Sequence, residues 1–123
     1  MSVQPIDASL EAQARARDLA QIASDAHGSD ILVLDIASLT TLADYFVVCT
    51  ADNVRMLRAI TRALSDAGAA GVARLNRVEG TPESGWVLMD FGAVIVHAFG
   101  KSEREFYQLD RLWADAPRLL VIQ

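Results

Sequence analysis

The stretch GWVLMDFGAVIVHAF, residues 85–99, decides the fold of this chain. Two runs rich in β-branched and aromatic side chains, residues 86–91 and 93–99, meet at Phe91 and Gly92. Because a glycine can adopt the positive φ of a tight connection, the stretch predicts two strands joined by a short turn. Alternation with a period of two gives each strand two faces. One face of the first strand carries Trp86, Leu88 and Asp90, and one face of the second carries Ile95, His97 and Phe99.

Further strands and helices are expected on the N-terminal side of this hairpin. Short β-branched runs bounded by polar residues predict strands buried on both faces at residues 31–36 and 44–50. Residues 72–78 predict a weaker strand. Apolar residues at helical spacing predict helices over residues 9–26 and from the N-cap Asn53 to Ala67.

A last helix is expected after the hairpin. Ser102 and Glu105 match the capping box S-x-x-E that opens a helix, and Pro117 closes it. No linker or repeat interrupts residues 1–123, so the chain is expected to form one α/β domain, a mixed β-sheet flanked by about three helices. The apolar positions of the last helix are Phe106, Leu109 and Trp113.

The charge of the chain bears on its partners. The formal net charge is −5 and the pI is about 4.8. Long-range electrostatics therefore disfavour direct RNA binding and favour a basic protein partner. Arg55, Arg58 and Arg62 form one cationic stripe on a helix, which is typical of a solvated face.

The absence of membrane-spanning and targeting patterns indicates where in the cell the protein is expected. No apolar run approaches the roughly 20 residues of a membrane-spanning helix. The N-terminal segment lacks an apolar signal core, and Asp7 and Glu11 argue against an organellar presequence. A bacterial cytoplasmic protein without membrane contact is expected. The single Cys49 lies in an apolar run and is predicted to be a buried core thiol.

Catalytic motifs are absent from the sequence. The chain has no phosphate-binding glycine loop, no HExxH and no GxSxG, so neither an enzyme nor a cofactor is expected. A metal- or nucleotide-dependent enzyme remains the competing hypothesis, because Asp35, Asp44 and Asp90 lie on or beside strands and could hold a divalent cation. His27 is expected at a helix end, and His97 is expected to pair with Asp90 or a backbone carbonyl.

The two tryptophans differ in their expected roles. Trp113 is predicted to belong to the core, as aromatic residues at helical spacing usually do. Trp86 follows a flexible loop at the start of a strand, where it could be core or could anchor an interface. The sequence leaves both alternatives open.

An ordered set of motifs resembles the Iojap-like ribosomal silencing factor family. The motifs are D-x-x-x-L-T (residues 35–40), A-D-Y-F-V-V (43–48), E-G (79–80), G-W-V-L-x-D-x-G (85–92), V-I-V-H (94–97) and R-E-F-Y-x-L-D-R-L-W (104–113). The resemblance covers about residues 10–116. It implies a nucleotidyltransferase-like fold without the catalytic motif. Residues 50–53, Thr-Ala-Asp-Asn, depart from the glycine-containing turn that the family often has there.

The resemblance also implies a non-enzymatic function. Members of the family bind the large ribosomal subunit through its protein numbered fourteen, at the face that meets the small subunit. They block joining of the subunits and repress translation, chiefly under nutrient limitation. A role in large-subunit assembly would use the same surface, and the sequence does not separate the two roles.

The expected contact surface combines the hairpin and the last helix. Little direct RNA contact is expected for the protein as a whole. The exposed patch of the hairpin and last helix could also form a homodimer in the free protein. The residues predicted to bind the ribosomal protein are Trp86, Leu88, Asp90, His97, Arg104 and Tyr107.

Overall fold

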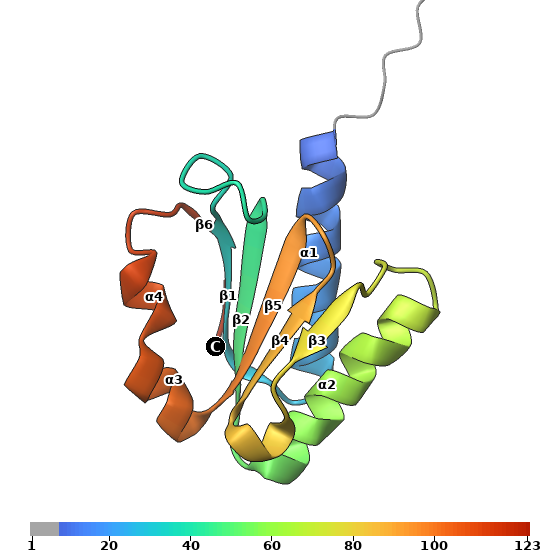
Figure 1. Ribbon diagram of the computed structural model, residues 1–123, viewed down its shortest axis with the longest axis vertical. Coiled ribbons are helices and arrows are strands. Elements are labelled where there is room, and N and C mark those ends of the chain that lie inside the picture. The colour runs from blue at the N-terminus through green and yellow to red at the C-terminus, as the bar shows by residue number, and fades with distance from the viewer. Residues whose placement is uncertain (1–7) are drawn as a thin grey trace, which may run out of the picture.

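The computed structural model describes residues 8–123, and Asp7 lies outside this range. The predicted mixed sheet is present and has six strands in the order β3-β4-β5-β2-β1-β6. Two long helices, α1 (Ala8–Asp25) and α2 (Val54–Ala69), cover one face of the sheet. Two short helices, α3 (Lys101–Tyr107) and α4 (Leu109–Leu112), lie on the opposite side (Figure 1).

The strands pair around the predicted hairpin. Strands β4 (Trp86–Asp90) and β5 (Val94–Gly100) are antiparallel, and β3 (Arg77–Glu79) extends the sheet beyond β4. Strand β2 (Tyr45–Ala51) runs parallel to β5, as a crossover connection through α2 allows. Strand β1 (Ser29–Asp35) is antiparallel to β2, and β6 (Arg118–Ile122) is antiparallel to β1 at the edge.

Two apolar layers hold the sheet between the helices. The first lies against α1 and α2, where alternate sheet residues such as Val47 and Val96 pack on Leu19 and Ile60. The second lies on the α3 and α4 side, where Phe99 packs with residues from β1, β2 and α4. Cys49 belongs to the first layer, as predicted, and burial raises the pKa of its thiol to about 12.

Helix α2 begins where the sequence predicts. The Asn53 side-chain oxygen accepts a hydrogen bond from the Met56 backbone N–H at 2.8 Å, which satisfies one of the free donors of the first turn. The buried side of the helix is formed by Leu57, Ile60 and Leu64. The N-cap is therefore confirmed. The expected apolar side of the helix is confirmed for Leu57, Ile60 and Leu64 but not for Val54, which is 43% exposed.

The predicted last helix is wrong in two respects. The helix is capped by Gly100, so Ser102 lies inside the first turn and cannot form the predicted capping box with Glu105. Gln108 adopts a left-handed conformation with φ of 47°, which ends α3 and separates it from α4. As a result Phe106 is 79% exposed, whereas Leu109 is buried.

Candidate functional site on the open sheet face

The register of the hairpin places two sets of side chains on one face. Trp86 pairs with Phe99, Leu88 with His97 and Asp90 with Ile95, so the two predicted faces are the same face of the sheet. The intervening residues Val87 and Met89 are buried under α1 and α2, whereas Trp86, Leu88 and Asp90 are only half-buried. We call this surface the open sheet face. It consists of Arg77, Glu79, Trp86, Leu88, Asp90 and Ile95.

The side chain of Trp86 is held by a hydrogen bond to His97 and by ring contacts with Phe99 and Tyr107. Its indole Nε1–H donates a hydrogen bond to Nδ1 of His97 at 3.2 Å. The centroid of its ring lies 4.5 Å from that of Tyr107 on α3 and 5.1 Å from that of Phe99 on β5. A half-buried tryptophan held by three neighbours presents a rigid apolar surface at little cost in conformational entropy.

His97 lies beneath this surface and is 5% exposed. Its partner is the Trp86 indole rather than Asp90 or a backbone carbonyl. Because Nδ1 accepts a hydrogen bond, the proton of the neutral ring is on Nε2, and the described residues offer that atom no partner. Burial lowers the pKa of His97 to about 4, so the ring is neutral at pH 7. His97 therefore orients Trp86 and is not itself a surface group.

Helices α3 and α4 add an apolar rim. The Tyr107 ring contacts that of Trp86 at an inclination of 48°, and its side chain is 43% exposed. Phe106 and Leu112 are 79% and 76% exposed. The sequence pattern marked Phe106 only as an apolar position of the last helix, and it did not single out Leu112. Trp113 packs edge-to-face on Phe46 within the second apolar layer, which confirms the prediction for that residue.

Arg104 joins α3 to the sheet. Its guanidinium donates two parallel hydrogen bonds to the Asp110 carboxylate, at 3.1 and 3.0 Å. It also donates to the Asp30 carbonyl at 2.8 Å and to Thr50 Oγ1 at 2.9 Å. Burial of Asp110 opposes its ionisation, but the hydrogen bonds and charge of Arg104 outweigh this effect and keep the pKa of Asp110 below its ordinary value. Arg104 therefore positions the rim through internal contacts.

Polar groups border the open sheet face on β3 and β4. The Asp90 carboxylate accepts a hydrogen bond from the Gly92 N–H at 2.8 Å and lies 3.9 Å from Arg77, which also pairs with Glu79 at 3.5 Å. Leu88 lines a shallow notch of about 220 Å³ with Glu79, Gly80 and Trp86. The arrangement is an apolar patch with a charged border, as in many protein interfaces.

The carboxylates of the competing enzyme hypothesis do not form a cluster. Asp35 accepts a hydrogen bond from the Ala37 N–H, and Asp90 accepts one from Gly92, so both stabilise turns. Within residues 8–123, no three His, Cys, Asp or Glu side chains lie close enough to share a metal ion. Nor does any helix in that range combine the length and apolar character needed to cross a bilayer.

Four of the six predicted site residues come together. Half-buried Trp86 and Leu88 form a patch with exposed Tyr107, and buried His97 contributes no group to its surface but accepts the hydrogen bond of Trp86. Asp90 lies at the opposite end of β4 from Trp86. Arg104 does not join the patch, because its guanidinium is bonded to Asp110. Sequence reasoning missed Arg77 and Glu79, although period-two alternation on β3 could have placed them on this face.

Comparisons with known proteins agree with this fold. A family model described as "Ribosomal silencing factor during starvation" matches residues 9–122. The Ribosomal silencing factor RsfS of Bacillus subtilis (strain 168) is 40% identical over 93 residues, which cover 76% of this chain and 79% of that protein. The chloroplastic protein Iojap of Arabidopsis thaliana is 31% identical over 93% of this chain and 48% of its own length.

Solved crystal structures of similar proteins share the fold of this chain. A crystal structure of a protein from Chromobacterium violaceum superposes with a TM-score of 0.73 at 32% identity, covering 80% of this chain and 83% of that one. A protein from Bacillus halodurans superposes with a TM-score of 0.73 at 28% identity, covering 85% and 95%. The chain therefore belongs to the ribosomal silencing factor family, RsfS.

Proposed function

We propose that this protein is a ribosomal silencing factor that docks on the large ribosomal subunit through the open sheet face and its apolar rim. Its contact there is the ribosomal protein numbered fourteen, at the surface that meets the small subunit. The bulk of the bound domain then blocks subunit joining and represses translation, chiefly under nutrient limitation. The protein acts in the bacterial cytoplasm and needs no cofactor or catalytic step.

The observation that carries the proposal is the aromatic patch formed by half-buried Trp86 and exposed Tyr107. Buried aromatic anchors contribute much of the binding energy at protein interfaces, and rigid side chains lose little entropy on binding. The acidic net charge of −5 favours encounter with a basic ribosomal protein. Leu88 and Asp90 complete the contact, while His97 and Arg104 hold its geometry.

The proposal is tested by sedimentation of isolated ribosomal subunits at a magnesium concentration that permits joining. The protein is expected to travel with the large subunit and to reduce the peak of joined ribosomes. Trp86→Ala is expected to remain at the top of the gradient. Leu10→Ala is the matched control, because Leu10 is 62% exposed on α1, which covers the other face of the sheet. A wild-type protein that leaves joining unchanged would contradict the proposal.

The same surface offers a contact between two copies of the free protein. Phe106 and Tyr107 on α3 and Leu112 on α4 expose large apolar side chains. Both helices lie on the side of the sheet away from α1 and α2 (Figure 1). Burying these side chains in a homodimer removes this apolar area from water. Light scattering over a range of concentrations is expected to show a dimer that Phe106→Ser weakens, and a monomer at every concentration would contradict this part.

A further inference from the structure

The charges of this acidic protein are unevenly distributed. We define the helical layer as α1, α2 and the loop of residues 70–76. It carries only four of the carboxylates in the described part of the chain, at Glu11, Asp18, Asp25 and Asp66. The rest of the chain therefore holds the acidic excess. The helical layer also carries six arginines, namely Arg15, Arg17, Arg55, Arg58, Arg62 and Arg74.

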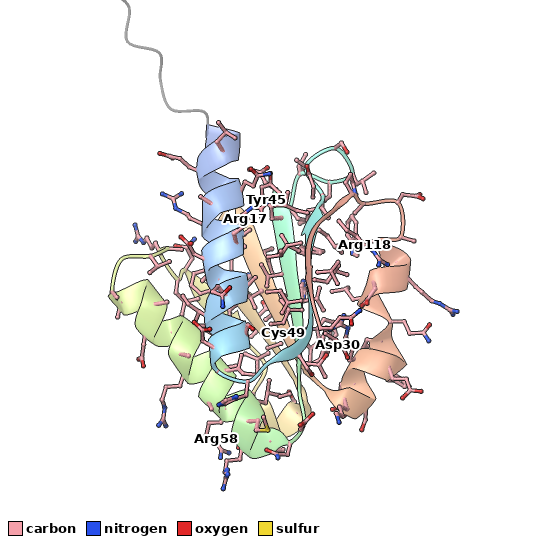
Figure 2. All side chains as sticks on the ribbon, turned by 180° about the vertical axis from the view of Figure 1, so that it is seen from behind. Arg17, Asp30, Tyr45, Cys49, Arg58 and Arg118 are labelled. Carbon is pink, nitrogen blue, oxygen red and sulfur yellow. The ribbon has the colours of Figure 1, made fainter. Side chains whose placement is uncertain are left out.

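These arginines are exposed and mostly without an acidic partner. All six side chains are exposed, and Figure 2 shows Arg17 on α1 and Arg58 on α2 on the same side of the sheet. Within the described residues, Arg58 is the only one of the six that forms an ion pair, with Glu83. Elsewhere in the described fold, three of the five basic residues, Arg77, Lys101 and Arg104, pair with a carboxylate.

Two hollows border α2 and contain four of these arginines. A cleft of about 790 Å³ lies at the C-terminal end of α2. Arg15 of α1 and Arg74 of the loop line it with Asn76 and with apolar residues that include Leu75 and Phe91. A groove of about 330 Å³ lies along the side of α2 that faces β3, and Arg58 and Arg62 line it. The C-terminal end of α2 carries a partial negative charge that opposes an anion, whereas the two guanidinium groups of the cleft favour one.

The extent of this basic surface indicates a polymeric ligand. Helix α2 has 16 residues, so the surface from its first turn to the cleft extends about 24 Å at 1.5 Å per residue. One phosphate would occupy only the cleft, whereas the repeated charges of a nucleic acid backbone continue along the helix. Arginine is also the side chain best suited to phosphate, because its planar donors form two parallel hydrogen bonds.

We infer that the helical layer binds the phosphate backbone of RNA, with Arg15 and Arg74 as its main contacts. This surface lies on the face of the sheet opposite to the open sheet face, so the protein could contact a basic protein on one side and RNA on the other. Little direct RNA contact is expected for the whole protein because of its net charge of −5. The inference departs from that expectation, because the charges are unevenly distributed over the fold. The inference does not depend on the proposed docking.

The test measures binding of a fluorescein-labelled RNA duplex of about 20 base pairs by anisotropy at several salt concentrations. Wild-type protein is expected to bind with an affinity that falls as salt rises. The double variant Arg15→Ala/Arg74→Ala is expected to bind roughly tenfold more weakly and to lower the slope of log K against log salt by about two. Arg15→Lys/Arg74→Lys retains both charges and is expected to restore most of the affinity.

Controls separate this inference from folding and from docking. Arg111→Ala removes an exposed arginine on α4 and is expected to bind RNA like the wild type, and so is Trp86→Ala. Circular dichroism melting shows whether each variant is folded. The inference fails if wild-type protein does not bind the duplex, or if the double alanine variant binds it equally well. It also fails if inorganic phosphate or adenosine monophosphate displaces the RNA at submillimolar concentration, because that outcome indicates a small-molecule site.

Discussion

Trp86 on β4 and His97 on β5 are joined by a hydrogen bond from the indole Nε1–H to Nδ1 of the imidazole, 3.2 Å long. The bond joins a half-buried residue to one that is 5% exposed. It fixes the angle of the indole relative to the sheet and leaves its remaining surface for a partner. The position of Trp86 therefore depends on a neutral histidine.

Replacing Trp86 separates anchoring from folding. Trp86→Ala should weaken docking on the large subunit by about 2 kcal/mol or more, roughly 30-fold, because a rigid anchor is lost from the centre of the patch. Trp86→Phe keeps an apolar ring but no N–H donor and should lose less. Competition binding to isolated large subunits measures both effects. If Trp86→Ala melts early yet docks normally, Trp86 is a core residue and the proposed anchor is wrong.

Replacing His97 should leave stability nearly unchanged but weaken docking. His97→Phe removes the unpaired, buried Nε2–H, so the free energy of unfolding should stay within about 1 kcal/mol of the wild type despite the lost hydrogen bond. Docking should weaken several-fold because the indole of Trp86 is no longer oriented. Urea unfolding and subunit binding measure the two quantities. Wild-type docking by His97→Phe would show that orientation of the indole is unimportant.

The low pKa of His97 predicts a pH dependence of stability. Burial holds the pKa of the folded state at about 4, whereas the unfolded chain has the ordinary value near 6.5. The unfolded state therefore binds the proton first as the pH falls. The stabilisation by neutral His97 is complete above pH 6.5 and is lost progressively down to about pH 4, by roughly 3 kcal/mol. Urea unfolding between pH 7.5 and 4.5 should show this loss in the wild type, and His97→Phe should lack most of it.

The contacts of Arg104 should stabilise helices α3 and α4. Arg104→Ala leaves the half-buried Asp110 without its partner and should reduce the free energy of unfolding by about 2 kcal/mol. Arg104→Lys keeps the charge but cannot form the two parallel bonds, so its effect should be intermediate. Hydrogen exchange should accelerate first in residues 101–113. Uniform acceleration across the sheet would instead indicate a general loss of stability.

Two glycines with similar backbone angles should respond differently to alanine. Gly80 and Gly71 have φ of 82° and 87°, so alanine is strained at both positions by roughly 1 kcal/mol. A Cβ at Gly71 meets nothing within 4 Å, whereas a Cβ at Gly80 collides with the backbone carbonyl of Trp86. Gly80→Ala should therefore cost clearly more stability than Gly71→Ala in urea unfolding, and it should weaken docking by displacing Trp86. An equal loss of stability in the two variants would contradict the expected collision between the Cβ at position 80 and the Trp86 carbonyl.

Local patterns in the sequence determined a large part of this structure. The hairpin of residues 86–99, the buried strands near residues 31 and 45, and the Asn53 cap follow from alternation, β-branched runs and side-chain chemistry within a few residues. The same alternation gave the sets of side chains on each strand of the open sheet face. The family motifs added the expected partner, which the residues alone do not name.

Only the tertiary structure decided the remaining features. Strand β6 exists because β1 offers an edge for pairing, and the break at Gln108 lets Leu109 reach the core while Phe106 stays exposed. The position of Arg104 depends on Thr50 and Asp30, which lie 54 and 74 residues away in the chain. Such contacts form only when distant elements pack together, so no spacing within the sequence could have predicted them. For the same physical reason, the indole of Trp86 acquires its partner His97 only when the strand register brings the two side chains together.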